Sequence, residues 1–468
     1  MVQGQAQRNG KLISAISSFT QKSPHMQKSI LTFALLLAAL AGYAQIEGMA
    51  PGRDGVQTYY RVYGNGAPIL LINGGPGLNS QGFEGLAAAL AKKYQVILYD
   101  QRGTGRTQLR SPGPETVTMD LMVADIEALR RQLGLQEWVV MGHSFGGILA
   151  SYYTARHPGM AKGLIASASG GPDLGMLDGF DLRGSLTQQQ RDSLDYWSAR
   201  IEGGDESPEA DLGRRRALAA AYLYKDEEHL EQVAARLGQG ERDINRWVWE
   251  DLRRIGYDVK PELSRFLKPA LILQGEADLI GKGPAEAAAG ALPNAELVYL
   301  PACGHYGWLE QPEAYFSAID RLMQRVAAFD EKEINKTLHT YVAAIYEADS
   351  TLAYSVADST LQKSGHYYSP GDGNWSYTDM TFEGLLRTAA NYNRKGWLPE
   401  GAPDEVEIFD IDNRVASAKV KAIWGFDYVL LSQNAWGQWR MDKVLWQSHN
   451  AEEAQRVRAG LVPRSSGN

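Results

Sequence analysis

Ser144 lies in the stretch GHSFGG, with a glycine two positions away on either side. The apolar run before it predicts a strand that ends at Gly142, and the residues from Phe145 onward predict a helix. A serine on the turn between them has a strained backbone close to neighbouring main chain, which requires flanking residues without a Cβ atom. Gly142, Gly146 and Gly147 therefore indicate one exposed hydroxyl above the end of a sheet, where it could act as a nucleophile.

A serine hydroxyl is a weak nucleophile near neutral pH, so the same chain must supply a base and an acid that orients it. Asp278 follows one late predicted strand, and His305 lies in the loop that follows the next. Because the carboxyl ends of parallel strands meet at one edge of a sheet, these side chains could meet the serine there. We therefore predict a catalytic triad of Ser144, Asp278 and His305, with Glu276 as the competing acid. Cys303 is an alternative nucleophile, but it lacks the turn between a strand and a helix.

Attack by such a serine on a carbonyl group produces an oxyanion, which needs preorganised hydrogen-bond donors. One predicted donor is the backbone N–H of Phe145, which follows the nucleophile. The second is predicted in the stretch NGGPG, where Gly75 lets the main chain approach a substrate and Pro76 fixes the turn after it.

Strands and helices alternate between about residues 55 and 329, and the strands are nearly continuous apolar runs. This pattern predicts an α/β fold, a parallel sheet with helices on both faces. The segment 58–64 is predicted as its edge strand. From about Pro172 to Phe266 the chain is charged and helical without strand signals, which predicts a helical insertion in the sheet domain.

The pattern changes beyond about Asp330. An amphipathic helix with Ile334, Leu338, Tyr341 and Ile345 on one face comes first, and four strand-like segments with short turns follow between residues 405 and 446. Helices first and strands last predict a separate α+β domain over residues 331–450.

The overall charge bears on the partners of the protein. A formal net charge of −8 argues against nucleic acid as a partner.

The apolar run Ile30–Ala44 follows lysines and ends in small residues, and it is shorter than the roughly 20 residues of a spanning helix. We therefore predict a signal peptide at residues 26–44, an exported protein, and no stable membrane span. The single cysteine excludes an internal disulfide, and no motif indicates a metal or cofactor.

Four stretches together resemble the proline iminopeptidase family of α/β-hydrolases, namely NGGPG, YDQRGTGRT, GHSFGG and GHYGWLEQPEAY. The resemblance covers about residues 55–329 and implies an α/β-hydrolase sheet with a helical cap at about 172–266. It implies an aminopeptidase that releases N-terminal residues, often proline, from peptides through an acyl-enzyme. The same residues carry over as the triad, with Gly75 and Phe145 as the oxyanion donors.

In that family, glutamates of the cap hold the free amine of the substrate. Glu250, in the stretch RWVWEDL, resembles the family's Trp-Glu element, which implies a substrate-binding role. Asn73 stands where the family usually has His, and Phe145 where many members have Trp. The resemblance therefore does not extend to narrow proline specificity.

The stretch DYVLLSQNAWGQWRMDKVLW resembles the cone-shaped domains of the nuclear-transport-factor-2-like superfamily, in the group named for lumazine binding. His366 and Asp427 could line a cavity there. A packing or homodimerisation module is the alternative, because no constellation of ligand-binding residues stands out.

Three functions remain open. The first is an exported aminopeptidase acting on peptides, and the second is an esterase or lactonase that uses the same triad on small metabolites. The third is a ligand-binding protein with an inert hydrolase scaffold, against which the complete set of Ser144, Asp278 and His305 argues.

Overall fold

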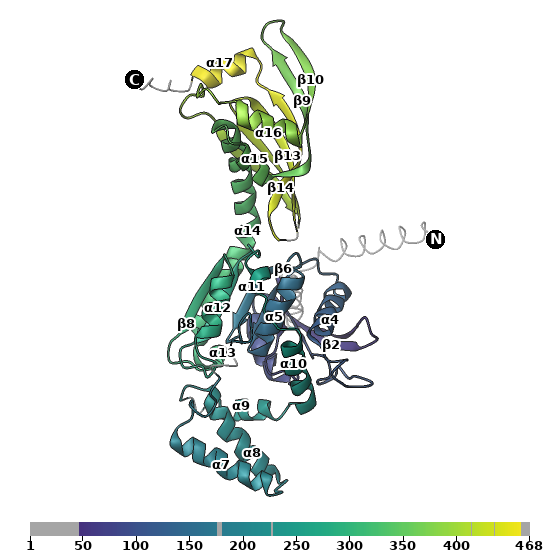
Figure 1. Cartoon of the computed structure of the whole chain (residues 1–468), viewed down its shortest axis with the longest axis vertical. Helices are drawn as coiled ribbons and strands as arrows, with labels where there is room; N and C mark the ends of the chain where they lie inside the picture. The colour runs from purple at the N-terminus through teal and green to yellow at the C-terminus, as the bar shows by residue number, and fades with distance from the viewer. Residues whose placement is uncertain (1–45, 176–179, 226–227, 413, 435, 460–468) are drawn as a thin grey trace, which may run out of the picture.

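The computed structural model describes residues 46–175, 180–225, 228–412, 414–434 and 436–459 (Figure 1). The predicted signal peptide lies outside these residues. No helix among them is both long enough and apolar enough to cross a bilayer.

The first sheet has eight strands in the order β1-β2-β4-β3-β5-β6-β7-β8. Its strands are β1 (Ile46–Pro51), β2 (Gln57–Tyr63), β3 (Pro68–Ile72), β4 (Gln95–Tyr99), β5 (Trp138–His143), β6 (Ala161–Ser167), β7 (Ala270–Gly275) and β8 (Ala295–Leu300). Strands β3 to β8 pair in parallel, whereas β1 pairs antiparallel with β2 and β2 with β4. The sheet is therefore mixed rather than parallel throughout, and β1, which the sequence reading missed, takes the edge position predicted for segment 58–64.

Helices cover both faces of this sheet, because successive strand residues point to opposite sides. Leu70 and Ile72 belong to a core that α4 (Met119–Gln132), α5 (Phe145–Arg156) and α12 (Gly283–Ala291) cover. Ile69 and Leu71 belong to the opposite core, under α3 (Glu84–Leu90) and the first half of α14 (Pro312–Tyr346). Apolar strands buried on both sides are typical of an α/β sheet.

A helical cap is inserted between β6 and β7. Its helices are α7 (Gln188–Glu202), α8 (Pro208–Ala219), α9 (Leu230–Leu237), α10 (Arg242–Arg254) and the short α11 (Lys260–Leu263). Local signals set two of its helix starts: Thr187 forms a capping box with Gln190, and Ser207 caps α8 just before Pro208. In Figure 1, α7 and α8 form the end of the molecule farthest from the C-terminal sheet.

Helix α14 runs unbroken from Pro312 to Tyr346, so the two helices predicted on either side of Asp330 are one. Its residues up to Val326 pack in the first domain, and those from Ile334 pack in the second. Asp330, between these halves, accepts hydrogen bonds from Gln433 Nε2 at 2.9 Å and Trp439 Nε1 at 3.0 Å. The helix therefore joins the two cores directly, without a linker (Figure 1).

The second sheet has six strands in the order β10-β9-β14-β13-β12-β11. Its strands are β9 (Ala357–Ser369), β10 (Asn374–Thr381), β11 (Asp404–Asp412), β12 (Val415–Ala422), β13 (Gly425–Gln433) and β14 (Trp439–Ser448), with helices α15 (Ser350–Val356), α16 (Phe382–Asn391) and α17 (Ala451–Ala459). The predicted antiparallel meander is present as β11 to β14. The hairpin of β9 and β10 precedes α16, so the predicted order of helices first and strands last is wrong. The nuclear-transport-factor-2-like identity of this α+β region stays a prediction.

Candidate active site

Ser144 occupies the turn between β5 and α5 with φ 57° and ψ −123°, a strained conformation for a residue with a side chain. The three neighbouring glycines are explained by close approaches. A Cβ atom on Gly142 would overlap the carbonyl oxygen of Gly146, and one on Gly146 would overlap that of Ile72. A Cβ atom on Gly147 would overlap the side chain of Ser169. The turn can therefore form only with glycines at these positions, and it holds the serine above the sheet.

His305 and Asp278 lie in contact with each other after β8 and β7. The Nδ1 atom of His305 is 3.0 Å from both carboxylate oxygens of Asp278. Both side chains are buried, and Asp278 Oδ1 also accepts the N–H of Ile280 at 3.0 Å. The contact follows from the strand register, since Gly275 of β7 pairs with Leu300 of β8 and the two loops leave the sheet side by side.

Ser144 and His305 line one cavity of about 320 Å³. Gly75 and Phe145, the predicted oxyanion donors, line the same cavity. Phe145 is the first residue of α5, so its N–H has no acceptor within the helix. Gly75 has φ +69° and belongs to the loop after β3, which lies beside the Ser144 turn because Ile72 pairs with Gly142. The structure thus brings five of the six predicted site residues, namely Ser144, Asp278, His305, Gly75 and Phe145, to one place.

The alternative acid and the alternative nucleophile lie elsewhere. Glu276 is exposed, and its nearest cation is Lys282 at 3.9 Å. Cys303 is buried with its Sγ 3.5 Å from the carbonyl oxygen of Gly304, and burial raises the pKa of the thiol well above its usual range. Neither lines the cavity that holds Ser144.

The model of the alpha/beta hydrolase fold family matches residues 67–312, which is more than half of the chain. The chain belongs to this family. It is 29% identical over 287 residues to a proline iminopeptidase of Lactobacillus delbrueckii subsp. bulgaricus, covering 55% of this chain and 91% of that protein.

Two solved structures have a similar fold. One is a proline iminopeptidase of Mycobacterium smegmatis, with 22% identity and a TM-score of 0.48 over 60% of this chain and 99% of that one. The other is the esterase RhEst1 from Rhodococcus sp. ECU1013, with 20% identity and a TM-score of 0.49 over 59% of this chain and 98% of that one.

Glu250, the sixth predicted site residue, is not brought to the cavity of this α/β-hydrolase. Its side chain is about half exposed, lies 3.8 Å from Arg246, and lines a separate hollow beside Trp247. Successive residues of a helix point about 100° apart. From the same helix, Trp249 and Arg253 line the Ser144 cavity instead.

Cap residues that the sequence reading did not single out hold the loop after β3. Arg236 Nη2 donates to the carbonyl oxygen of Gly74 at 2.7 Å, and Asn245 Nδ2 donates to that of Pro76 at 2.8 Å. The Glu241 N–H donates to the carbonyl oxygen of Gly77 at 2.9 Å. The geometry of this loop of the α/β-hydrolase therefore depends on the position of the cap.

Aromatic side chains pack around His305. The ring centroid of His143 lies 4.6 Å from that of His305, and those of Tyr222 and Tyr306 lie 5.4 and 5.5 Å away. Burial holds the pKa of His143 well below its usual range, so this imidazole stays neutral beside His305. The packing fixes the plane of the His305 ring.

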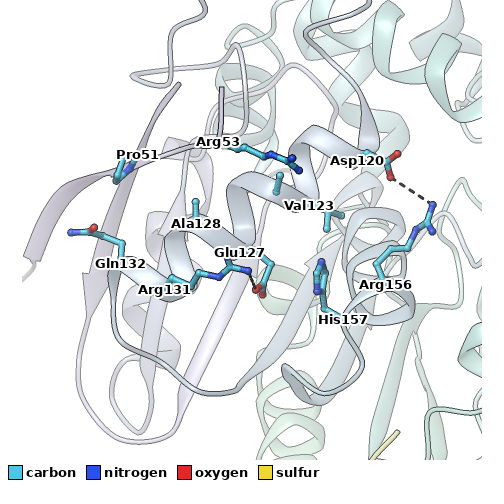
Figure 2. A pocket seen from close by; sticks show the side chains of 11 residues that line it. Pro51, Arg53, Asp120, Val123, Glu127, Ala128, Arg131, Gln132, Arg156 and His157 are labelled. Carbon is cyan, nitrogen blue, oxygen red and sulfur yellow. Dashed lines mark hydrogen bonds and ion pairs between the residues drawn. The ribbon is translucent and has the colours of Figure 1, made fainter. Parts of the chain in front are cut away.

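A larger hollow, of about 830 Å³, lies between β1, α4 and the end of α5 (Figure 2). Its wall carries ion pairs between Arg131 and Glu127 at 3.5 Å and between Arg156 and Asp120 at 3.7 Å. None of the predicted triad residues lines it. The larger of these two cavities is therefore not the one that holds the predicted nucleophile Ser144. Among the described residues no group of three or more His, Cys, Asp and Glu side chains is arranged to hold a metal ion.

Proposed function

We propose that this α/β-hydrolase is a serine aminopeptidase that releases N-terminal residues from peptides. The observation that carries the proposal is that His305, which is paired with Asp278 at 3.0 Å, lines the same cavity as the strained Ser144. Support for peptides as substrates comes from the relative named proline iminopeptidase, which the match covers over 91% of its length.

The proposed reaction has two halves. His305 takes the hydroxyl proton of Ser144 while Oγ attacks the carbonyl carbon, and the N–H groups of Gly75 and Phe145 stabilise the oxyanion. The protonated imidazole, stabilised by Asp278, then gives its proton to the leaving amine as the C–N bond breaks. Water, deprotonated by the same imidazole, then attacks the carbonyl carbon of the resulting ester. As the bond between this carbon and Ser144 Oγ breaks, the imidazolium returns the proton to Oγ and the N-terminal residue leaves as a free acid.

A comparison of free and blocked substrates tests the peptide specificity. Aminoacyl arylamides with a free amine should be cleaved, and their N-acetylated forms should not, while Ser144→Ala should cleave neither. Equal rates on free and acetylated arylamides would contradict the aminopeptidase and leave the serine hydrolase in place.

A second candidate function is hydrolysis of small acyl esters, which the lining of the cavity favours. Among its described lining residues none carries a carboxylate, and Arg253 supplies a positive charge. An ammonium group of a substrate would therefore find no partner of opposite charge in the described part of the wall. A panel of short acyl esters and aminoacyl arylamides separates the two functions by their ratio of kcat/KM.

Export and self-association are further parts of the proposal. The short apolar run Ile30–Ala44 supports a cleaved signal peptide. In the C-terminal sheet, Tyr428, Leu430 and Leu445 of neighbouring strands are 51%, 52% and 60% exposed. An exposed apolar face of this kind supports a homodimer formed through the sheet. Sedimentation velocity of the full chain tests it, with Leu430→Lys expected to give the monomer.

A further inference from the structure

Arg236 connects the cap to the catalytic edge of the sheet. It belongs to α9, is only 4% exposed, and lies with its guanidinium 4.4 Å from the ring centroid of Phe83. Its Nη2 donates to the carbonyl oxygen of Gly74 at 2.7 Å, a hydrogen bond between residues 162 positions apart in the chain. No carboxylate among the described residues forms an ion pair with it. The cation is therefore directed at a main-chain oxygen rather than at an acid.

The carbonyl group of Gly74 and the N–H of Gly75 belong to one peptide unit. This unit is planar, so a donor that holds the oxygen also sets the direction of the N–H. The Gly74 oxygen accepts a second hydrogen bond, from Asn73 Nδ2 at 3.2 Å. Donors on the oxygen polarise an amide and make its N–H a stronger donor. The peptide that supplies the predicted oxyanion donor is thus held and polarised by hydrogen bonds to its carbonyl oxygen.

We propose that Arg236 is a positioning residue for the oxyanion, acting through the Gly74–Gly75 peptide to orient the Gly75 N–H and strengthen it as a donor. The inference rests on the proposed serine hydrolase. The cation lies at the oxygen end of this peptide, opposite the N–H, and it is buried, so water screens its attraction for a developing negative charge less than at the surface. Because Arg236 belongs to the cap, the position of the cap controls the strength of this oxyanion donor.

The role predicts a specific change in kinetics. An interaction made only with the oxyanion changes kcat and leaves KM in place. Loss of one direct oxyanion donor costs about 100- to 1,000-fold in turnover, so loss of a residue acting through that donor should cost about 10- to 100-fold. Replacing a residue that only supports the fold would instead lower the stability of the protein, and the loss of turnover would not be matched by a loss of affinity for a transition-state analogue.

The experiment compares Arg236→Gln, Arg236→Lys and the control Arg215→Gln in the full chain. Arg215 is also a cap arginine that donates to a main-chain oxygen, that of Ala234 at 3.3 Å, but it does not reach the loop after β3. For each variant, kcat and KM on a short acyl ester are measured together with the inhibition constant of an alkyl boronic acid, which forms a tetrahedral anion on the serine.

The expected result is a lower kcat for Arg236→Gln with nearly unchanged KM, and a boronate affinity that falls in the same proportion. Arg236→Lys, which keeps the charge, should lose less on both scales, and Arg215→Gln should match the wild type. If Arg236→Gln does not fold, the test rests on Arg236→Lys, in which the loss of kcat and the loss of boronate affinity should again be in proportion.

Two results would overturn the inference. One is unchanged turnover in the Arg236 variants, and the other is reduced turnover with wild-type boronate affinity. Failure of the proposed function looks different, since Ser144→Ala would then keep its turnover or the boronate would not inhibit the wild type.

Discussion

Replacing Asp278 by Asn tests the role of the carboxylate in the proposed triad, which is to orient His305 and to stabilise its protonated form. Oδ1 of Asp278 accepts the N–H of Ile280 at 3.0 Å, and both carboxylate oxygens lie 3.0 Å from His305 Nδ1. An Asn that keeps its oxygen at the Oδ1 position therefore places its amide nitrogen in the Oδ2 position, also within hydrogen-bond distance of Nδ1. That nitrogen is a donor, which places the imidazole proton on Nε2, where it blocks uptake of the Ser144 proton. The loss of charge also removes the partner of the imidazolium, so kcat should fall by about 10³- to 10⁴-fold, or about 4–5.5 kcal/mol.

The assay is steady-state hydrolysis of an aminoacyl arylamide and of an acyl ester, normalised to the fraction of folded protein. Glu276→Gln is the matched control, because it makes the same chemical change two residues earlier on an exposed side chain. It should stay within about twofold of the wild type, in the range of surface substitutions. The reasoning is refuted if Asp278→Asn keeps a tenth or more of wild-type turnover, or if Glu276→Gln loses as much.

Other predictions concern stability and processing. Gly142→Ala should lower the melting temperature strongly, because its Cβ atom would overlap main chain. Gly290→Ala has no atom within 4 Å of its Cβ and should stabilise the helix by about 0.5–1 kcal/mol. Equal melting temperatures of the two variants would contradict this prediction. Asp427→Asn leaves the buried ammonium of Lys363 without its carboxylate at 2.8 Å and should cost about 3–5 kcal/mol in denaturant unfolding, and a loss below 1 kcal/mol would show that the pair is not needed. Mass spectrometry of the native protein should give a mature chain that begins near Gln45, and an intact N-terminus would exclude export by signal cleavage.

The positions of Ser144, Asp278 and His305, the predicted triad, could be inferred from the sequence because each follows from a local pattern. The glycines around Ser144 indicate a turn in which a residue with a Cβ atom would overlap its neighbours. Asp278 and His305 each lie in a loop that follows an apolar strand. Parallel topology then brings the ends of those strands together. Glu250 shows the limit of this reasoning, since a shift of one position along a helix changes the direction of a side chain by about 100°.

Other features leave no local pattern. Strand β10 is exposed along nearly its whole length, so it lacks the alternation that identifies a half-buried strand. Arg236 looks like any surface arginine of a charged helix, because its acceptor is a main-chain oxygen far away in the chain. The unbroken helix α14 was predictable in part, since no glycine or proline interrupts residues 313–346.

Covalent labelling of the wild-type protein with a fluorophosphonate, followed by peptide mapping, tests the central claim most directly. If Ser144 is the nucleophile, one adduct forms on Ser144, and both labelling and turnover disappear in Ser144→Ala. Labelling in His305→Ala should be several powers of ten slower, because the serine then lacks its base. An adduct on any other residue, or a Ser144→Ala variant that still turns over substrate, would contradict the account.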